Sequence, residues 1–316
     1  MTRALVSGAA GFLGSHLSEA LLRAGWEVIG VDDLSTGRAE NLATFREDPR
    51  FTFLRRDLTE PATFPPVDFV FHLASPASPP HYQRRPIATL SVNSTGTAQL
   101  LAHARESGAR FLLASTSEVY GDPEVHPQPE SYWGHVNPTG PRSCYDEGKR
   151  FAEALTMAWH RERGLDVRIA RIFNTYGPRM RPDDGRVMSN FFLQGWKGLP
   201  LTIHGTGLQT RSFCYVDDLV RGLVALMEAT SVDGPVNLGN PDFEVTVLEL
   251  AQRIRALTGG RSKLAFVERP TDDPERRRPD IARARTLLHW EPSTPLDEGL
   301  RATSEYFRER AGGEVT

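Results

Sequence analysis

Three glycines that follow a short apolar run near the start of the chain constrain its fold more than any other feature. Residues 4–7 have the composition of a buried strand, and Gly8, Gly11 and Gly14 lie between this run and a predicted helix. Glycines at this spacing allow a pyrophosphate to approach free backbone N–H groups and the positive end of the helix. The next apolar run ends at Asp32, where a carboxylate can accept hydrogen bonds from the hydroxyls of an adenosine ribose. The glycines and the acid together predict a dinucleotide site, because glycines that only formed a turn would not account for Asp32.

The same acid indicates which dinucleotide is bound. Its negative charge repels a ribose 2′-phosphate and favours NAD over NADP, although Arg38 is close enough in sequence to weaken this argument. Asp57 and Leu58 follow a third predicted strand and are candidates for contacts with the adenine. Residues 73–75 follow a fourth strand, and we expect them to lie beneath the cofactor.

The spacing of further apolar runs predicts the fold class. Runs that are nearly continuous, as in strands buried on both faces, occur at 4–7, 27–31, 51–55, 67–73, 110–115 and 167–172. Helical patterns lie between most of them, so the alternation predicts an α/β fold with a doubly wound parallel sheet. After Asn174, glycine and proline divide the chain into shorter pieces. We therefore predict a dinucleotide-binding domain over residues 1–174 and a smaller α/β substrate-binding lobe over 175–316, with about 212–242 packing back on the first domain.

Composition and charge exclude several classes of protein. The chain has 37 Lys and Arg against 40 Asp and Glu, a net charge of −3, which offers no general field for nucleic acid or an anionic membrane. No apolar stretch approaches the roughly 20 residues of a membrane span, and glycines interrupt any N-terminal signal pattern. Cys144 and Cys214 form no metal-ligating pattern, and His72, His126 and His135 lack metal-ligand spacing, so we expect no metal. These observations predict a cytoplasmic protein.

A second group of residues has the pattern of a catalytic site. Thr116 and its neighbours follow a buried strand, at the edge where an open parallel sheet presents its ligands. Tyr145 and Lys149 are four residues apart, which places both on one face of a helix. A nearby ammonium and a positively charged nicotinamide favour the phenolate of a tyrosine, which can then act as a base at neutral pH. This pair is common by chance, but its place after the glycines, the acid and a Ser/Thr cluster predicts a catalytic role.

In these motifs the chain resembles the extended short-chain dehydrogenase/reductase family that modifies nucleotide sugars, and the resemblance covers nearly the whole chain. Within that family it is most similar to the UDP-glucuronate decarboxylases, also called UDP-xylose synthases. The segments that carry this similarity are HLASPASPP at 72–80, ASTSEVYGDPE at 114–124, YWGHVNP at 132–138, CYDEGK at 144–149 and RIFNTYGPR at 171–179. The resemblance implies a Rossmann-type sheet, tightly held NAD and a UDP-sugar substrate. It implies oxidation of UDP-glucuronate at C4, loss of CO2 from C5 and re-reduction to UDP-xylose, with no metal.

The resemblance also implies roles for single residues. Tyr145 corresponds to the base of the family, Lys149 to its partner, and Thr116 to a hydrogen-bond relay to the sugar hydroxyl. Glu118 and Arg277 correspond to residues associated with decarboxylation. We expect burial and the nearby substrate carboxylate either to raise the pKa of Glu118, making it a proton carrier, or to destabilise the substrate carboxylate relative to the transition state.

The residue at position 117 helps to distinguish decarboxylation from the reactions of related enzymes. Ser117 stands where the related sugar-nucleotide 4,6-dehydratases carry an aspartic acid that protonates the departing hydroxyl, and the 4-epimerases generally lack the glutamate at position 118. Dehydration and 4-epimerisation nevertheless remain alternatives, because all three reactions begin with the same hydride transfer. A non-catalytic NAD-sensing module is a remote alternative, since such a protein is expected to have lost Tyr145 or Lys149.

The predicted site has three sets of residues, and the resemblance adds a partner. The catalytic set is Thr116, Glu118, Tyr145, Lys149 and Arg277. The cofactor-binding set is Gly8, Gly11, Phe12, Leu13, Gly14, Asp32, Asp33, Asp57, Leu58, Leu73, Ala74, Ser75, Asn93, Tyr145 and Lys149. The substrate-binding set is Tyr82, Ser117, Asn174, Arg179, Val187, Asn190, Thr202, His204, Gln209, Arg211 and Arg277. The partner is a second copy of the chain, because in relatives the helices around 90–104 and 148–159 pair with their two-fold mates.

Overall fold

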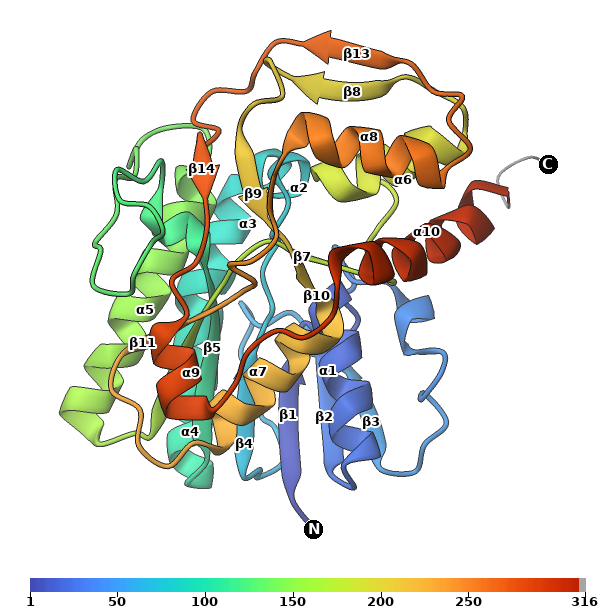
Figure 1. The fold of residues 1–316 in the computed structure, drawn as a ribbon. Helices are drawn as coiled ribbons and strands as arrows, with labels where there is room; N and C mark the ends of the chain where they lie inside the picture. The colour runs from blue at the N-terminus through green and yellow to red at the C-terminus, as the bar shows by residue number, and fades with distance from the viewer. Residues whose placement is uncertain (313–316) are drawn as a thin grey trace.

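A seven-stranded parallel sheet is the framework of the computed structural model, which describes residues 1–312 (Figure 1). The strands lie in the order β11-β6-β5-β4-β1-β2-β3. Their bounds are β1 (Arg3–Ser7), β2 (Glu27–Asp32), β3 (Phe51–Arg55), β4 (Phe69–His72), β5 (Arg110–Thr116), β6 (Val167–Ile172) and β11 (Pro235–Leu238). The strand order reverses between β1 and β4, the point at which open α/β sheets bind their ligands. The prediction of a doubly wound parallel sheet is confirmed.

Helices cover both faces of this sheet. On one face, Leu17, Leu219 and Trp290 lie in a buried core beneath α1, α7 and the segment after α9. On the other face, α4 and α5 bury Leu101 and Ala152 in a second core. The helices of these two layers are α1 (Phe12–Arg23), α3 (Pro86–Ser91), a π-helical turn (Val92–Gly96), α4 (Thr97–Ser107), α5 (Ser143–Arg163), α7 (Val216–Glu228) and α9 (Ala282–Leu288). The helix expected around 90–104 is thus divided among three of them.

A lobe with its own core lies beyond the carboxyl ends of the strands (Figure 1). Phe192, Leu250 and Phe307 form this core from α6, α8 and α10. The elements that complete the molecule are η1 (Ala39–Leu42), α2 (Pro79–Arg84), η3 (Ser117–Tyr120), β7 (Thr175–Tyr176), α6 (Val187–Trp196), β8 (Leu201–His204), β9 (Thr210–Ser212), β10 (Cys214–Tyr215), β12 (Glu244–Thr246), α8 (Val247–Leu257), β13 (Leu264–Val267), β14 (Arg276–Arg277) and α10 (Leu296–Gly312). Both β11 and α9 lie on the sheet, so the later chain is shared between sheet and lobe. A domain boundary at residue 174 stays a prediction.

The parallel direction of the strands places functional side chains along one edge. β1 leads into Gly8, β2 ends at Asp32 and β5 ends at Thr116. Because the carboxyl ends of parallel strands meet at the same edge, these residues lie beneath the lobe. Within residues 1–312, no helix has both the length and the apolar composition needed to cross a membrane.

Candidate active site

The glycine turn between β1 and α1 is packed so closely that side chains do not fit. Gly8 has φ 71°, in the left-handed region. A Cβ at Gly14 would lie 2.0 Å from the carbonyl oxygen of Gly8, and one at Gly11 would lie 3.0 Å from the same atom. Gly11 precedes α1 with no side chain capping the helix, so the first N–H groups remain available to a ligand. This cradle fits a dinucleotide pyrophosphate.

Two adjoining cavities meet at this turn. They share Gly8, Gly11, Thr36, Leu73 and Ser75. One, the nucleoside cavity, is also lined by the predicted cofactor residues Asp32, Asp33, Asp57, Leu58 and Ala74. The other, the catalytic cavity, is also lined by Phe12, Leu13, Gly14, Thr116, Ser117, Glu118, Tyr145, Lys149 and Asn174. NAD extended across the glycines would thus have its adenosine in one cavity and its nicotinamide in the other.

Asp32 is held in place by the loop that follows it. Its carboxylate accepts hydrogen bonds from the N–H groups of Ala10 at 3.0 Å and Leu34 at 2.8 Å. Burial raises its pKa, and these two bonds oppose the rise. Arg38 forms an ion pair with Glu40, so its charge is already matched. Asn93 is buried and lines neither cavity, but its Nδ2 donates to the Ser75 hydroxyl at 2.9 Å.

Tyr145 and Lys149 are both buried in the catalytic cavity. The ring of Tyr145 stacks on that of Tyr82, with centroids 5.1 Å apart and planes at 2°. Burial raises the pKa of Tyr145 to about 12, although a hydrogen bond with Thr116 opposes the rise. Lys149 Nζ donates to the Ala114 carbonyl at 2.9 Å, and burial lowers its pKa to about 7. The protein alone therefore does not produce a phenolate, and the effect of a positively charged nicotinamide stays a prediction.

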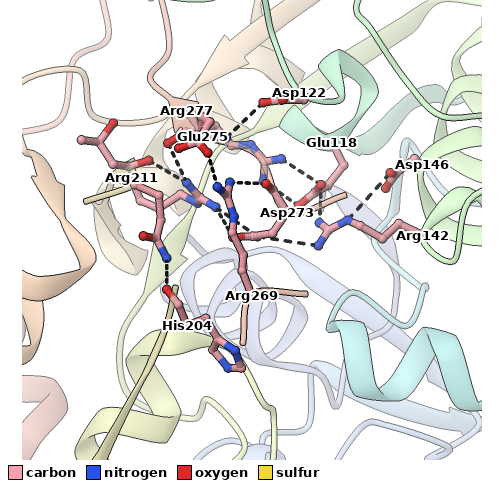
Figure 2. A network of polar contacts seen from close by, with 12 residues as sticks. Glu118, Asp122, Arg142, Asp146, His204, Arg211, Arg269, Asp273, Glu275 and Arg277 are labelled. Atoms are coloured by element: carbon pink, nitrogen blue, oxygen red, sulfur yellow. Dashed lines mark hydrogen bonds and ion pairs between the residues drawn. The ribbon is translucent and has the colours of Figure 1, made fainter. Parts of the chain in front are cut away.

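Glu118 lies between two buried arginines, which sequence reasoning did not foresee (Figure 2). Its Oε1 accepts from Arg277 Nη1 at 2.6 Å, and its Oε2 accepts from Arg277 Nη2 at 2.9 Å and from Arg142 Nη2 at 2.6 Å. Burial alone would raise the pKa of Glu118, but the two guanidinium groups outweigh burial and hold the pKa well below its usual range. The expectation of a raised pKa for Glu118 is therefore wrong, and the alternative, that its charge destabilises the substrate carboxylate relative to the transition state, stays a prediction.

The raised pKa belongs to the neighbouring Asp146. Burial and the charge of Glu118 raise the pKa of Asp146 to about 8, although Arg142 opposes the rise. Its Oδ2 lies 4.0 Å from Arg142 Nε, and its buried Oδ1 has no hydrogen-bond partner within residues 1–312. Within this cluster the raised pKa is therefore that of Asp146, while that of Glu118 is lowered.

Arg211 and Arg277 are neighbours across two strands of the lobe. In the parallel pair β9 and β14, Arg277 lies opposite Arg211. Arg211 Nη2 contacts both carboxylate oxygens of Asp273 at 3.1 Å (Figure 2). Gln209 Nε2 donates to the carbonyl of His204 at 2.8 Å.

The remaining predicted substrate residues lie around the lobe. Val187 begins α6, and Asn190 Nδ2 donates to the Gly185 carbonyl at 3.1 Å. The Thr202 hydroxyl accepts from Gln194 Nε2 at 3.0 Å. Arg179 forms an ion pair with Glu19 of α1 and does not line the catalytic cavity.

Several residues that line the catalytic cavity were missed. They are Thr36, Asn41, Ala77, Ser78, His81, Arg181, Asp184 and Arg186. Arg186 is paired with Asp184, and its charge lowers the pKa of Tyr145. The alternation of Arg and Asp between 179 and 186 was a signal in the sequence, but it resembled a solvated loop. Ser78 Oγ and His81 Nε2 are buried without hydrogen-bond partners in the described chain, which leaves them available to a bound ligand.

Two histidines outside the cavity, His72 and His126, have structural partners. His72 lies between the hydroxyls of Ser7 at 2.8 Å and Thr97 at 3.0 Å, and burial lowers its pKa to about 3. His126 contacts Glu244 at 3.2 Å. Among residues 1–312, no group of three His, Cys, Asp or Glu side chains is arranged to hold a metal ion.

Comparisons with known proteins agree with this geometry. Residues 4–239 match the NAD dependent epimerase/dehydratase family. UDP-glucuronic acid decarboxylase 1 of Danio rerio is 55% identical over 96% of this chain and 72% of the relative. UDP-glucuronic acid decarboxylase 3 of Arabidopsis thaliana is 52% identical over 98% of this chain and 90% of the relative.

Solved structures share the whole fold. The UDP-glucuronic acid 4-epimerase of Bacillus cereus, in complex with UDP-glucuronic acid and NAD, has a TM-score of 0.88 and 30% identity, with coverage of 98% of this chain and 100% of that chain. The dTDP-glucose 4,6-dehydratase DesIV of Streptomyces venezuelae has a TM-score of 0.89 and 28% identity, with coverage of 99% and 98%. The chain belongs to the NAD dependent epimerase/dehydratase family, in the branch that contains the UDP-glucuronic acid decarboxylases.

Proposed function

We propose that the protein is an NAD-dependent UDP-glucuronate decarboxylase that converts UDP-glucuronate to UDP-xylose and CO2. One observation carries this proposal: Glu118, bound by Arg142 and Arg277, lines the same cavity as Tyr145 and Lys149. Tyr145 and Lys149 suit proton and hydride transfer at C4. Glu118 and its two arginines supply charges where a C5 carboxylate must react. The similarity to decarboxylases over 96% of the chain supports the same reaction.

The residues of the catalytic cavity divide the chemistry between them. NAD, held at the glycine turn and by the two cavities, would supply the hydride acceptor and donor that reaction at C4 requires. Tyr145 accepts the proton of the C4 hydroxyl, and Thr116, which is hydrogen-bonded to it, relays that proton. Lys149 is buried below them, where its ammonium form would favour the phenolate.

Oxidation at C4 prepares the loss of CO2. It creates a carbonyl group β to the carboxylate, so the electron pair of the breaking bond between C5 and the carboxylate carbon enters a C4 enolate. A proton then forms the new bond at C5, and the sugar carbonyl takes back the hydride. Arg277 orients the carboxylate in this scheme, because its guanidinium offers two parallel donors to a carboxylate.

Dehydration and epimerisation remain the alternatives, and product analysis separates them. The purified protein is incubated with UDP-glucuronate and NAD, and the products are followed by NMR and by trapping of labelled CO2. Release of CO2 with formation of UDP-xylose supports the proposal. Formation of the C4 epimer without CO2 would instead indicate an epimerase like the Bacillus cereus relative.

We also propose a homodimer. Ile87, Leu90 and Phe151 are 79%, 44% and 51% exposed, and they lie on α3 and α5, which pack against each other. Three large apolar side chains on adjoining helices favour cover by a second copy. A cytoplasmic location is proposed as well, because Cys144 and Cys214 are both free.

A further inference from the structure

Glu118 has more positive charge around it than one carboxylate needs. Arg277 alone satisfies both of its oxygens with two contacts, at 2.6 and 2.9 Å. Arg142 adds a third contact at 2.6 Å, and its side chain is only 8% exposed. Burial of a surplus guanidinium costs several kcal/mol unless another anion offsets it. Arg142 also lies 4.0 Å from carboxylate oxygens of Asp146 and Asp273, beyond hydrogen-bond distance, so its one short side-chain contact is to Glu118.

The position of Arg142 makes this surplus more notable. Arg142 precedes the first turn of α5, and its carbonyl accepts from the N–H of Tyr145 at 3.0 Å. A cation at the N-terminal end of a helix is disfavoured by the helix dipole. Its Nε is buried and has no hydrogen-bond partner within residues 1–312, and the same holds for Nε of Arg277. The cluster thus has unused donors, and its two guanidinium groups share a single carboxylate within hydrogen-bond distance.

A second carboxylate would match this charge. On the proposed function, on which this inference rests, the substrate brings its C5 carboxylate into the cavity that Glu118 lines. Two carboxylates near each other repel unless each has a cation. Arg277 can turn to the substrate only if another cation stays on Glu118, and Arg142 already contacts Glu118 Oε2.

We propose that Arg142 is a positioning residue that keeps Glu118 compensated while Arg277 receives the C5 carboxylate of UDP-glucuronate. When neutral CO2 leaves, the negative charge stays in the C4 enolate and is neutralised as C5 takes up a proton, so no second carboxylate remains and Arg277 returns to Glu118. Arg142 therefore makes the site prefer the substrate, which has this carboxylate, over the product UDP-xylose, which lacks it.

The experiment compares the two ligands in the Tyr145→Phe background, so that UDP-glucuronate is not consumed during calorimetry. Arg142→Gln should weaken binding of UDP-glucuronate at least tenfold and change that of UDP-xylose less than twofold. Arg142→Lys, which keeps the charge, should restore most of the preference. Equal losses for both ligands, or no loss for either, would overturn the proposal.

Two further variants test how Arg142 acts. In a Glu118→Gln background, Arg277 is already free, so adding Arg142→Gln should change the preference for UDP-glucuronate less than threefold. A tenfold loss there would mean that Arg142 contacts the substrate itself and would overturn the positioning role. This comparison holds even if Arg142→Gln alone does not fold.

Arg150→Gln is the matched control. Arg150 lies two turns later on α5, and its Nη1 donates to the carbonyls of Val119 at 3.0 Å and Trp133 at 2.7 Å. It thus supports the same turn without contacting the carboxylate cluster, and both affinities should be unchanged. Because binding is measured without turnover, a failure of this inference is distinguishable from the absence of CO2 release by the unmodified protein, which would refute the proposed function.

Discussion

Replacement of Glu118 by Gln is the most informative single change, because the structure allows its size to be worked out. The substitution keeps the shape and one oxygen acceptor but removes the charge that Arg142 and Arg277 share through three contacts of 2.6 to 2.9 Å. Removing one partner of a buried ion pair costs about 3–5 kcal/mol. We take about 3 kcal/mol, since one acceptor remains. At roughly 2–4 °C per kcal/mol for a large domain, the Tm should fall by about 6–12 °C.

The same substitution has the opposite effect on substrate binding. It leaves two guanidinium groups without an anion, so UDP-glucuronate should bind at least as tightly as in the unmodified protein. Release of labelled CO2 should nevertheless fall by about a hundredfold or more, on the proposal that Glu118 takes part in decarboxylation. Calorimetry, thermal unfolding and CO2 trapping on the same preparation measure the three quantities.

Asp218→Asn is the control for the loss of a buried ion pair. Asp218 pairs with Arg221 at 2.7 Å, has a fully buried side chain and lines neither cavity. Its Tm should fall by a similar amount while CO2 release by the folded enzyme stays within about threefold. Unchanged decarboxylation in Glu118→Gln with intact binding would show that Glu118 only supports the turn before Tyr120. Weaker binding of UDP-glucuronate would show that the cluster does not receive the carboxylate.

The remaining predictions concern the base, the cofactor site, the buried acid and the assembly. Tyr145→Phe removes the phenolic oxygen but keeps the stacked ring, so C4 oxidation should fall about a hundredfold or more while NAD is retained, as NADH formation and bound-nucleotide analysis would reveal. Asp32→Ala should weaken NAD more than NADP in equilibrium binding, and equal losses would rule out recognition of the ribose hydroxyls. Gly14→Ala places a Cβ 2.0 Å from the Gly8 carbonyl oxygen, so purified protein should contain far less NAD than wild type. The folded-state pKa of Asp146, raised from 3.8 to about 8, means that its stabilising contribution is fully present only below about pH 4 and is lost as pH rises through 8. Between pH 6 and pH 9, the free energy of unfolding of Asp146→Asn should therefore fall less than that of the wild type. Parallel curves of unfolding free energy against pH would contradict the raised pKa of Asp146. Sedimentation at micromolar concentration should show a dimer, and a 35.1 kDa monomer alone would refute the proposed apolar contact.

Features that depend on local sequence could be predicted. The parallel sheet follows from apolar runs alternating with helical patterns, and the glycine turn from the steric needs of the chain between β1 and α1. Thr116, Tyr145 and Lys149 line one cavity, and this could be predicted because the end of a strand and the face of a helix both show in the spacing of residues. Each of these inferences uses residues only a few positions apart.

The charges of the site could not be predicted in this way. Arg142 and Arg277 are 24 and 159 positions from Glu118, and only the folded chain places both on one carboxylate. Basic residues at these positions have the same local pattern as a solvated surface. For the same reason the sequence could not show that the pKa of Glu118 is lowered and that of Asp146 raised, because the sign of such a shift depends on neighbours that are distant in sequence.

The pairing of β9 with β14 links recognition of the diphosphate to recognition of the C5 carboxylate of the proposed substrate. Arg211, which the family resemblance places near the diphosphate, lies opposite Arg277, which would orient the C5 carboxylate. A ligand that fixes the first strand therefore also fixes the second, and the nucleotide end of the molecule contributes binding energy to alignment at the reacting end. Glucuronate 1-phosphate, which lacks the uridine and one phosphate, should accordingly be decarboxylated more slowly even at saturating concentration. In such a site, binding of the nucleotide contributes to catalysis at the sugar as well as to selection of the substrate.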